Sequence, residues 1–574
     1  MIICEKRQSI LEANGHVLVL GGPGSGKSTI ALLKARRQIE AGLKPGQSVL
    51  FLSFSRAAVS RLAEAATAEL GGKKDGIKIQ TFHSFYWEIL RAHGYLLGAP
   101  CKLTLLPPQD ERVLSKGIKA DKDPNEWESW LKERERLFSE KGLVAFDLFA
   151  PKVAELLARS KSVARLFGNR YPLILVDEAQ DTADPQWQAV RQLAPFSQLV
   201  CLADLDQQIF DFLPGVGPER IQQIQRELAP LVIDFEAENY RSPGTQIAEF
   251  GNAILAGYTQ GGPYQGVSKL SFSPKDKDVS IRRALGMLNK VLTKELGHVP
   301  ESIGILASFE KGVAAISVAL QNGGRPIPHK VMFDETSTLL SARFLAFLME
   351  PKWPIERTQN IHQALSLIEA VHRAQRSSTA QKRADRLAAW ANGLMAGTSL
   401  RGSLPKAIGS LIQHIEEMKF TGDPRKDWSH VCDLLQESQD ADLMAIKGHL
   451  RHTMLFSRGR SIASGLSEVW ESSRAYISAR KIVDTALSQD QLISGGEHLS
   501  GIHVMTMHKS KGKQFDGVII LRADWISPFV WPGDSAPFSK SRKVLRVAAT
   551  RARVHTLILY QAFPPCPIVG NFAL

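Results

Sequence analysis

The chain has 574 residues, more than a single hydrophobic core usually organises, so we expect several domains. Its 71 Lys and Arg residues outnumber the 58 Asp and Glu residues, and the net charge of +13 favours a polyanionic partner such as nucleic acid. Five scattered Cys residues without a C-x-x-C pair disfavour a disulfide framework and a zinc ribbon, and no apolar run is long enough to span a membrane, so we expect a soluble cytoplasmic protein with no membrane partner.

A phosphate-binding loop follows the first apolar segment of the chain. Residues 17–20 are a run of Val and Leu typical of a buried parallel strand, and a helix is predicted over 29–39. The glycine spacing between them fits the P-loop pattern G-x-x-x-x-G-K-[ST], in which backbone N–H groups turn onto phosphate oxygens. Lys27 would reach the β- and γ-phosphates and Ser28 would bind Mg²⁺. The predicted nucleotide-binding residues of this loop are Gly21, Gly22, Pro23, Gly24, Ser25, Gly26, Lys27, Ser28 and Thr29.

Weaker signals lie on both sides of this loop. Gln8, on a predicted short helix, can pair its carboxamide with the edge of adenine, although an ordinary surface glutamine is an equally good interpretation. Strands are predicted over 48–54 and 77–80, and their carboxyl ends are where ligands of doubly wound sheets bind. The residues that these strands bring to that edge are Phe54, Arg56, Thr81 and His83. Taken singly, each of them also fits a core or loop position.

Two consecutive carboxylates follow the strand predicted over 173–176. Asp177 is placed to hold Mg²⁺ through its water shell, and Glu178 is placed to polarise an attacking water. The alternative interpretation is an acidic surface turn. A buried pair of acids without a cation would be costly, so the P-loop upstream favours the catalytic interpretation.

Another polar segment follows the strand that begins at Leu199. Gln207 would sense the γ-phosphate there, and Phe210 and Phe212 would offer flat faces for base stacking, although both phenylalanines fit a core equally well. A second sheet is predicted to begin at residues 231–235.

The remaining sequence alternates between helical and strand-forming stretches. We predict helices without strands over 86–145 and over 351–493. Further strands are predicted over 303–306, 518–521 and 555–560. One helical stretch carries a basic face for which contact with a nucleic-acid backbone and simple solvation are the two interpretations, the second being commoner. The residues of this face are Arg373, Arg376, Lys382, Arg383 and Arg386.

In their order along the chain, these segments resemble the motifs of superfamily 1 DNA helicases of the UvrD, Rep and PcrA type. The resemblance covers nearly the whole chain. Gln8 matches the family's adenine-reading glutamine. In order, the family's motifs I, Ia, Ib, II, III, IV, V and VI match Gly21 to Ser28, Ser53 to Arg56, Thr81 to His83, Asp177 to Asp181, Asp206 to Phe212, Asn239 to Ser242, Thr506 to Gly512 and Val547 to Ala552.

The resemblance implies an α/β fold with two RecA-like P-loop NTPase lobes, each with a parallel sheet and a mainly helical insertion. The implied boundaries are 1–85 and 146–234 for the first lobe, 86–145 for its insertion, 235–351 and 496–574 for the second lobe, and 352–495 for its insertion. ATP and Mg²⁺ would lie between the lobes, with Arg241 and Arg551 as arginine fingers from the second. Tyr240 would stack on adenine, and Gln514 would contact the ribose from a position where the family usually has glutamate.

The same resemblance implies a single-stranded or tailed duplex DNA substrate and 3′ to 5′ movement. The implied DNA contacts are Phe54, Arg56, Thr81, His83, Phe210, Phe212, Thr506 and His508. Two other functions remain open. One is a DNA-sensing ATPase that acts with a separate nuclease subunit, as in bacterial anti-phage defence, and the other is an RNA helicase.

Overall fold

The computed structural model describes residues 4–22, 24–116, 118, 123–204, 217, 219–235, 242–257, 263–322, 324–331, 336–353, 355–375, 378–398, 402–450, 457–492 and 500–569. The chain divides into two compact units. The first, here called the sheet unit, comprises Met1–Ile89, Ala150–Phe333 and Ser494–Leu574, and the second, the helical unit, comprises Leu90–Phe149 and Asp334–Ile493. Among the described helices, none is both long and apolar enough to cross a membrane.

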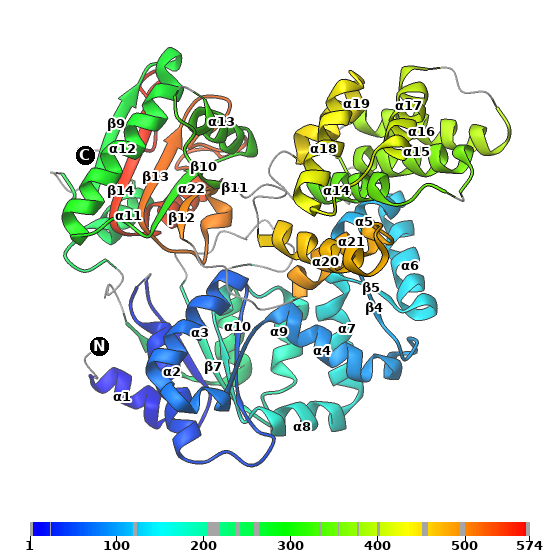
Figure 1. Ribbon diagram of the computed structural model, residues 1–574. Coiled ribbons are helices and arrows are strands. Elements are labelled where there is room, and N and C mark those ends of the chain that lie inside the picture. The colour runs from blue at the N-terminus through cyan, green and yellow to red at the C-terminus, as the bar shows by residue number, and fades with distance from the viewer. Residues whose placement is uncertain are drawn as a thin grey trace. The chain divides into compact units, whose positions relative to one another are not determined.

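The first sheet of the sheet unit has six parallel strands (Figure 1). They are β1 (Val17–Leu20), β2 (Val49–Ser53), β3 (Ile77–Thr81), β6 (Leu173–Val176), β7 (Gln198–Ala203) and β8 (Leu231–Asp234), in the order β3-β2-β6-β7-β1-β8. The interior strands are continuous apolar runs because both faces of a parallel sheet are covered. The prediction that residues 231–235 begin a second sheet is wrong, since β8 pairs with β1 from Val17↔Leu231 to Leu20↔Asp234.

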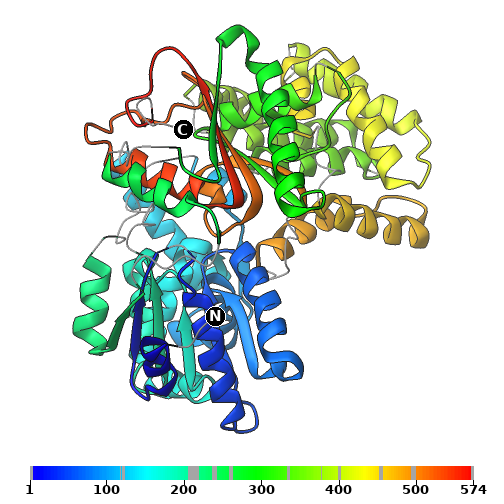
Figure 2. The ribbon, with the colours of Figure 1, turned by 90° about the vertical axis from the view of Figure 1, so that its left-hand side faces the viewer.

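Helices before and between these strands cover the first sheet (Figure 2). They are α1 (Glu5–Glu12), α2 (Lys27–Glu40), α3 (Arg56–Leu70), α4 (Phe82–His93), α7 (Phe146–Arg159), α8 (Lys161–Arg170), α9 (Asp184–Arg191) and α10 (Glu219–Leu228). Alternate residues of β1, β2, β6 and β7 pack with α1, α2 and α3 in one apolar core, as side chains on successive strand positions point to opposite faces. The P-loop therefore follows β1, a strand that is buried inside the sheet.

The second sheet also has six parallel strands. They are β9 (Val267–Phe272), β10 (Ser302–Ala307), β11 (Lys330–Val331), β12 (Gly501–Thr506), β13 (Phe515–Arg522) and β14 (Ala552–Gln561), in the order β11-β12-β10-β13-β14-β9. One face packs on α11 (Ile247–Ala256) and α22 (Ser539–Ala549), and the other on α12 (Lys277–Leu296) and α13 (Glu310–Gln321). Val518 and Ile520 of β13 belong to the first of these cores, and Ile519 and Leu521 to the second.

The helical unit is built mainly from α5 (Pro108–Leu114), α6 (Pro124–Lys141) and eight later helices. These are α14 (Thr336–Met349), α15 (Arg357–Arg373), α16 (Ser378–Met395), α17 (Ser403–Glu417), α18 (Pro424–Glu437), α19 (Ala441–Leu450), α20 (Ser457–Ser473) and α21 (Ala479–Leu492). Residues 86–145 are not wholly helical as predicted, because β4 (Thr104–Leu106) and β5 (Leu143–Ala145) form a small parallel pair. Three-residue strands are too short to produce a readable alternation.

Two of the five residues of the predicted basic face form ion pairs within the helical unit, whereas Lys382 and Arg386 are exposed, as simple solvation predicts. Arg373 is buried and bonds Asp385 at 2.7 Å and Glu369 at 3.0 Å. Arg383 is ion-paired with Asp442. These two side chains therefore connect helices of the unit, which agrees with neither the nucleic-acid contact nor simple solvation. Arg376 lies outside the described residues.

The prediction of an α/β fold with two parallel sheets and mainly helical insertions is confirmed. The four implied domain boundaries stay a prediction. The division into units places residues 334–351, which the boundaries assign to the second lobe, with the helical unit, where α14 packs against α15, α19 and α21.

Candidate nucleotide-binding site

The P-loop connects β1 to α2, as its sequence predicts. Gly24 and Gly26 have φ angles of 85° and 88°, which non-glycine residues rarely adopt, so the tight turn depends on both glycines. Lys27 Nζ donates hydrogen bonds to the carbonyl oxygens of Gly21 at 2.7 Å and Gly22 at 2.9 Å. Ser28 and Thr29 lie in the first turn of α2, where the backbone N–H groups and the helix dipole favour an anion.

The predicted acidic pair lies at the carboxyl end of β6, two strands from β1 in the same sheet. Asp177 accepts a hydrogen bond from Ser53 Oγ at 3.2 Å, and its backbone N–H bonds Leu52 O. Glu178 has a φ of 51°, a strained value for a residue with a side chain. The structure therefore holds Glu178 in an unusual backbone conformation at the point where the catalytic base is predicted.

Gln180 organises the acidic segment around Glu178. Its Nε2 donates to Glu178 Oε2 at 2.6 Å, and its Oε1 accepts from the backbone N–H of Asp204 at 3.0 Å. Asp204, at the end of β7, lies 3.9 Å from Lys27 Nζ. The ends of β6 and β7 and the start of α2 are thus connected through polar side chains.

Burial acts to raise the pKa of both carboxylates, but the balance with the neighbouring charges differs between them. Burial, together with the negative charge of Glu178, raises the pKa of Asp177 to about 6. Burial also acts to raise the pKa of Glu178, but the positive charges of Lys511 and Lys27 outweigh it and lower that pKa below its ordinary value. Glu178 is therefore held as a carboxylate, the form that a general base requires.

Two positively charged side chains from loops beside strands of the second sheet lie near this acidic cluster. Lys511, after β12, forms an ion pair with Asp181, with both side chains almost fully buried. The guanidinium of Arg551, just before β14, contributes to the lowered pKa of Glu178. Arg551 is 2% exposed, and its Nε donates to Val547 O at 2.8 Å. The structure thus brings the predicted finger Arg551 within electrostatic range of the predicted base.

The two carboxamides predicted to contact the nucleoside lie in different surroundings. Gln8 is exposed on α1, where its Nε2 donates to Glu12 Oε1. Its neighbour Arg7 is buried, with its guanidinium 4.8 Å from the ring centroid of Phe235. Gln514 is half-buried directly before β13.

The described DNA-contact candidates occupy strand ends in both sheets. Phe54 follows β2 and its ring centroid lies 4.8 Å from that of Phe82. Thr81 ends β3, and its Oγ1 accepts from the backbone N–H of Ser84 at 3.2 Å, beside half-buried His83. Thr506 ends β12, and His508 follows it.

The predicted site residues outside the described residues are Pro23, Gln207, Phe210, Phe212, Tyr240 and Arg241, and the side chain of Arg56 is also outside them.

Sequence reasoning missed several residues of this cluster. Lys511 and Asp181 lie inside predicted motifs but received no role, and they are 330 residues apart in the chain. Arg546, on α22, is 2% exposed, lies 3.9 Å from Asp204 and bonds Asn252 Oδ1 at 3.1 Å. Only a weak signal was available in the sequence, because Arg546 stands among the apolar residues of the C-terminal half of α22, Val544, Leu545 and Val547–Ala549, where a charge requires a partner.

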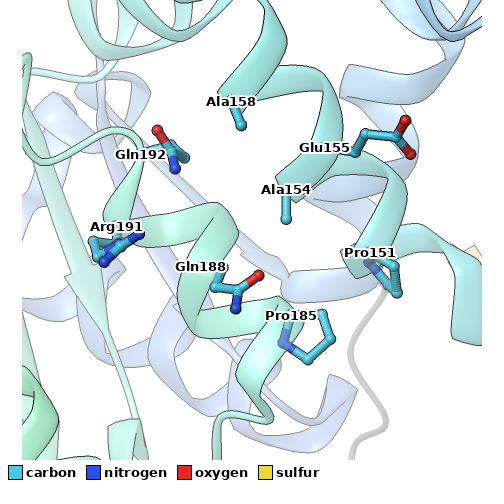
Figure 3. A pocket seen from close by; sticks show the side chains of 8 residues that line it. All are labelled: Pro151, Ala154, Glu155, Ala158, Pro185, Gln188, Arg191 and Gln192. Carbon is cyan, nitrogen blue, oxygen red and sulfur yellow. The ribbon is translucent and has the colours of Figure 1, made fainter.

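A separate groove of about 290 Å³ lies between α7 and α9 (Figure 3). The groove does not include any of the predicted site residues. Its lining residues are Pro151, Ala154, Glu155, Ala158, Pro185, Gln188, Arg191 and Gln192.

Two family models match the chain, and together they cover more than half of it. The UvrD/REP helicase N-terminal domain matches residues 4–128 and 114–228. The UvrD-like helicase C-terminal domain matches residues 454–562. These ranges contain the P-loop, the acidic pair and the segments that carry Lys511 and Arg551.

Curated relatives show the same relationship over part of their length. The ATP-dependent DNA helicase Rep of Escherichia coli is 26% identical over 288 residues, 44% of this chain and 42% of Rep. The ATP-dependent DNA helicase PcrA of Staphylococcus aureus is 23% identical over 278 residues, 42% of this chain and 38% of PcrA. The alignments thus span about two fifths of each relative.

Among solved structures, the Pif1 helicase of Candida albicans is 15% identical, covering 50% of this chain and 55% of its own, with a TM-score of 0.24 that is too low to bear on the fold. The two family models, in the order expected along one chain, are decisive. The chain belongs to the UvrD/Rep helicase family.

Proposed function

We propose that this chain hydrolyses ATP and uses the energy to move 3′ to 5′ along single-stranded DNA, separating duplex ahead of it. One observation carries the proposal. Glu178, the predicted base at the end of β6, lies under the positive influence of Lys27 from the P-loop and of Lys511 and Arg551 from the second sheet's segments. A hydrolytic site that needs groups from two sheets makes hydrolysis depend on how those sheets approach each other.

The roles follow from the chemistry of phosphoryl transfer. The P-loop amides and Lys27 would bind the β- and γ-phosphates, Glu178 would orient the attacking water, and Arg551 would neutralise charge that develops in the transition state. Arg241, Gln207, Tyr240, Gln8 and Gln514 keep their proposed roles around the nucleotide.

Asp177 and Ser28 fit a magnesium ion that is shared with the nucleotide. The buried Asp177 carboxylate has a raised pKa, so a cation beside it would relieve an unfavourable charge. Among the described residues, no cluster of three or more His, Cys, Asp or Glu has the arrangement of a metal site. Mg²⁺ often binds through one or two carboxylates plus substrate phosphates, and there it would neutralise phosphate charge.

DNA as the substrate is supported by family membership and by the net charge of +13. Phe54, Thr81, His83, Thr506 and His508 lie at or directly after the carboxyl ends of strands, in both sheets. A single strand of DNA bound to both sheets would advance when the two sheets approach and separate with each ATP turnover.

The test combines ATPase and unwinding measurements on the full chain. We expect single-stranded DNA to stimulate ATP hydrolysis, and a duplex with a 3′ tail to be unwound while one with a 5′ tail is not. ATPase activity without unwinding of either duplex would favour the DNA-sensing ATPase that serves a separate nuclease. Stronger stimulation by RNA than by DNA would favour an RNA helicase, and absence of ATPase activity would refute the proposal.

A further inference from the structure

Four neighbouring strands of the second sheet end beside aromatic side chains. In the order β12-β10-β13-β14, these strands are all parallel, so their carboxyl ends lie along one edge (Figure 1). His508 follows β12, Phe309 follows β10, Trp525 follows β13 and Phe563 follows β14. Because parallel strands lie about 4.8 Å apart, the row extends over roughly 14 Å.

The turn that carries Trp525 displays the indole to solvent. Trp525 is 91% exposed and has a φ of 63°, which is unusual for a bulky residue. Reciprocal backbone bonds between Ala523 and Ser527, at 3.0 and 2.9 Å, close the turn. Ser527 Oγ also accepts from the backbone N–H of Ser308 at 2.9 Å. A strained and well-braced turn that presents an exposed tryptophan is typical of a binding element.

Gln561 joins this turn to the segment that carries Phe563. Its Nε2 donates to Asp524 Oδ2 at 3.1 Å and to Phe563 O at 2.6 Å, and its Oε1 accepts from the backbone N–H of Asp524 at 3.3 Å. Phe563 is 78% exposed. One carboxamide therefore fixes the backbone beside both exposed rings.

Trp531 continues the row toward β12. Its ring lies edge-on to Phe309 at 4.9 Å and to His508 at 5.0 Å between centroids. All three side chains are half-buried. The row thus begins at His508, which is already a candidate DNA contact, and becomes more exposed toward β14.

We propose that Trp531, Trp525 and Phe563 form a stacking surface for unpaired bases that extends the single-stranded DNA path from His508 along the carboxyl edge of the second sheet. This inference rests on the proposed function. Aromatic faces bind any base through stacking, so the surface would tolerate all sequences. Unpaired bases can reach these rings, whereas bases stacked within a duplex cannot.

Charge near the row favours a polyanion over an apolar protein partner. The backbone N–H of Trp531 donates to Ser541 Oγ at 3.0 Å, which places Trp531 beside the first turn of α22. The first two turns of α22 contain Lys540, which is exposed, and Lys543, which is half-buried. The two carboxylates nearby are each bonded within the protein, Asp524 to Arg522 at 3.0 Å and Asp534 to the backbone N–H of Ser541 at 2.8 Å. Aromatic rings next to basic side chains are the combination that single-strand binding surfaces use.

The test measures the Kd of a fluorescent oligothymidylate of about 20 nucleotides for the full chain by anisotropy. We expect Trp525→Ala and Phe563→Ala each to raise this Kd by about 5- to 150-fold, and Trp525→Phe to restore most of the affinity. ATP hydrolysis without DNA should stay at the wild-type rate in these variants, because Trp525 and Phe563 are held by Ala523, Ser527 and Gln561, none of which belongs to the nucleotide cluster.

Trp353→Ala is the matched control, since Trp353 is a tryptophan 86% exposed in the helical unit. Wild-type DNA affinity in the double variant Trp525→Ala/Phe563→Ala would overturn the inference and leave the proposed function intact. A loss of DNA affinity in Trp353→Ala equal to that in Trp525→Ala would have the same meaning. Failure of the unaltered chain to bind the oligonucleotide in any nucleotide state would instead refute the DNA substrate itself.

Discussion

Lys511 and Asp181 form a buried ion pair between a segment that follows β12 in the second sheet and one that follows β6 in the first. Their side chains are only 7% and 1% exposed. Burial raises the pKa of Asp181 to about 7 even beside Lys511, so removing Lys511 leaves a buried carboxylate without compensation only above that pH. At about pH 9, Lys511→Met should therefore lower the free energy of unfolding by about 3 to 5 kcal/mol. Urea unfolding followed by circular dichroism measures this loss.

Lys447→Met is the control for the buried pair, because Lys447 bonds Asp433 at 3.0 Å where the partner side chains are 28% and 62% exposed. We expect a loss below about 1 kcal/mol for that exposed pair. The double variant Lys511→Met/Asp181→Leu should regain much of the loss of the single variant. Additive losses in this double-mutant cycle would show that the two residues do not act as a pair.

Lys27→Ala should abolish ATP hydrolysis while the fold persists. The positive charge of Lys27 favours the ionised form of both Asp177 and Glu178, although burial and Glu178 leave the pKa of Asp177 raised, and Lys27 is the P-loop group predicted to bind phosphate. We expect hydrolysis to fall by at least roughly a hundredfold. Lys44→Ala, at an exposed lysine in the next loop, should keep the wild-type rate. Undiminished hydrolysis in Lys27→Ala would place the phosphate site elsewhere.

Glu178→Gln should separate binding from hydrolysis. The substitution removes the base but keeps a side chain that can still bond Gln180, so ATP affinity should change by less than about threefold while kcat falls by about 10²- to 10⁴-fold. A fluorescent nucleotide measures binding and phosphate release measures turnover. Glu155→Gln, in an ion pair on α7, should alter neither quantity. A loss of affinity with normal residual turnover would assign the base to another residue.

The sequence predicted those parts of the fold that depend on local composition. The apolar runs of β1, β2, β6, β7, β10 and β13 could be read directly, because interior parallel strands are Val- and Leu-rich. Strand β9, with the sequence Val-Ser-Lys-Leu-Ser-Phe, lies at the sheet's edge and mixes apolar with polar residues without a regular alternation, so it was missed. The sheet to which β8 belongs could not be predicted, because its sequence fits an edge of either sheet.

The residues of the candidate site likewise fall into those that a local sequence pattern identifies and those that only the packing of distant segments brings together. Gly21 to Ser28 and Asp177–Glu178 are continuous segments whose spacing reveals their chemistry. The approach of Lys511 to Asp181 and of Arg546 to Asp204 depends on how segments hundreds of residues apart pack together. A local pattern identifies such a residue as a motif member but does not name its partner.

Lys352 should make the stability of the helical unit depend on pH. Burial lowers the pKa of this lysine to about 7, although its Nζ donates to Glu350 O at 2.7 Å. Between pH 7 and its unfolded pKa near 10.4, the unfolded chain binds the proton and the folded chain does not. Stability therefore rises with pH in this window, by roughly 3 kcal/mol from about pH 7 to 9.5.

Lys352→Met tests this dependence, because its apolar side chain carries no proton and can occupy the same buried position beside Phe347. Urea unfolding across the pH range should give a flatter profile for this variant than for the wild type. Lys426→Met, at an exposed lysine on α18, should leave the wild-type slope unchanged. An equal slope in Lys352→Met and in the wild type would mean that other groups cause the pH dependence.

Trp525→Gly should stabilise the fold while it weakens DNA binding. Glycine adopts a φ of 63° without the steric cost that a side chain incurs there, so the free energy of unfolding should rise by about 0.5 to 1 kcal/mol. Loss of the exposed indole should raise the Kd for single-stranded DNA. Thermal unfolding and oligothymidylate binding measure the two effects. Lower stability together with unchanged affinity would mean that Trp525 supports the fold and does not bind DNA. A gain in stability together with a loss of DNA affinity is expected where a strained backbone conformation is retained for binding.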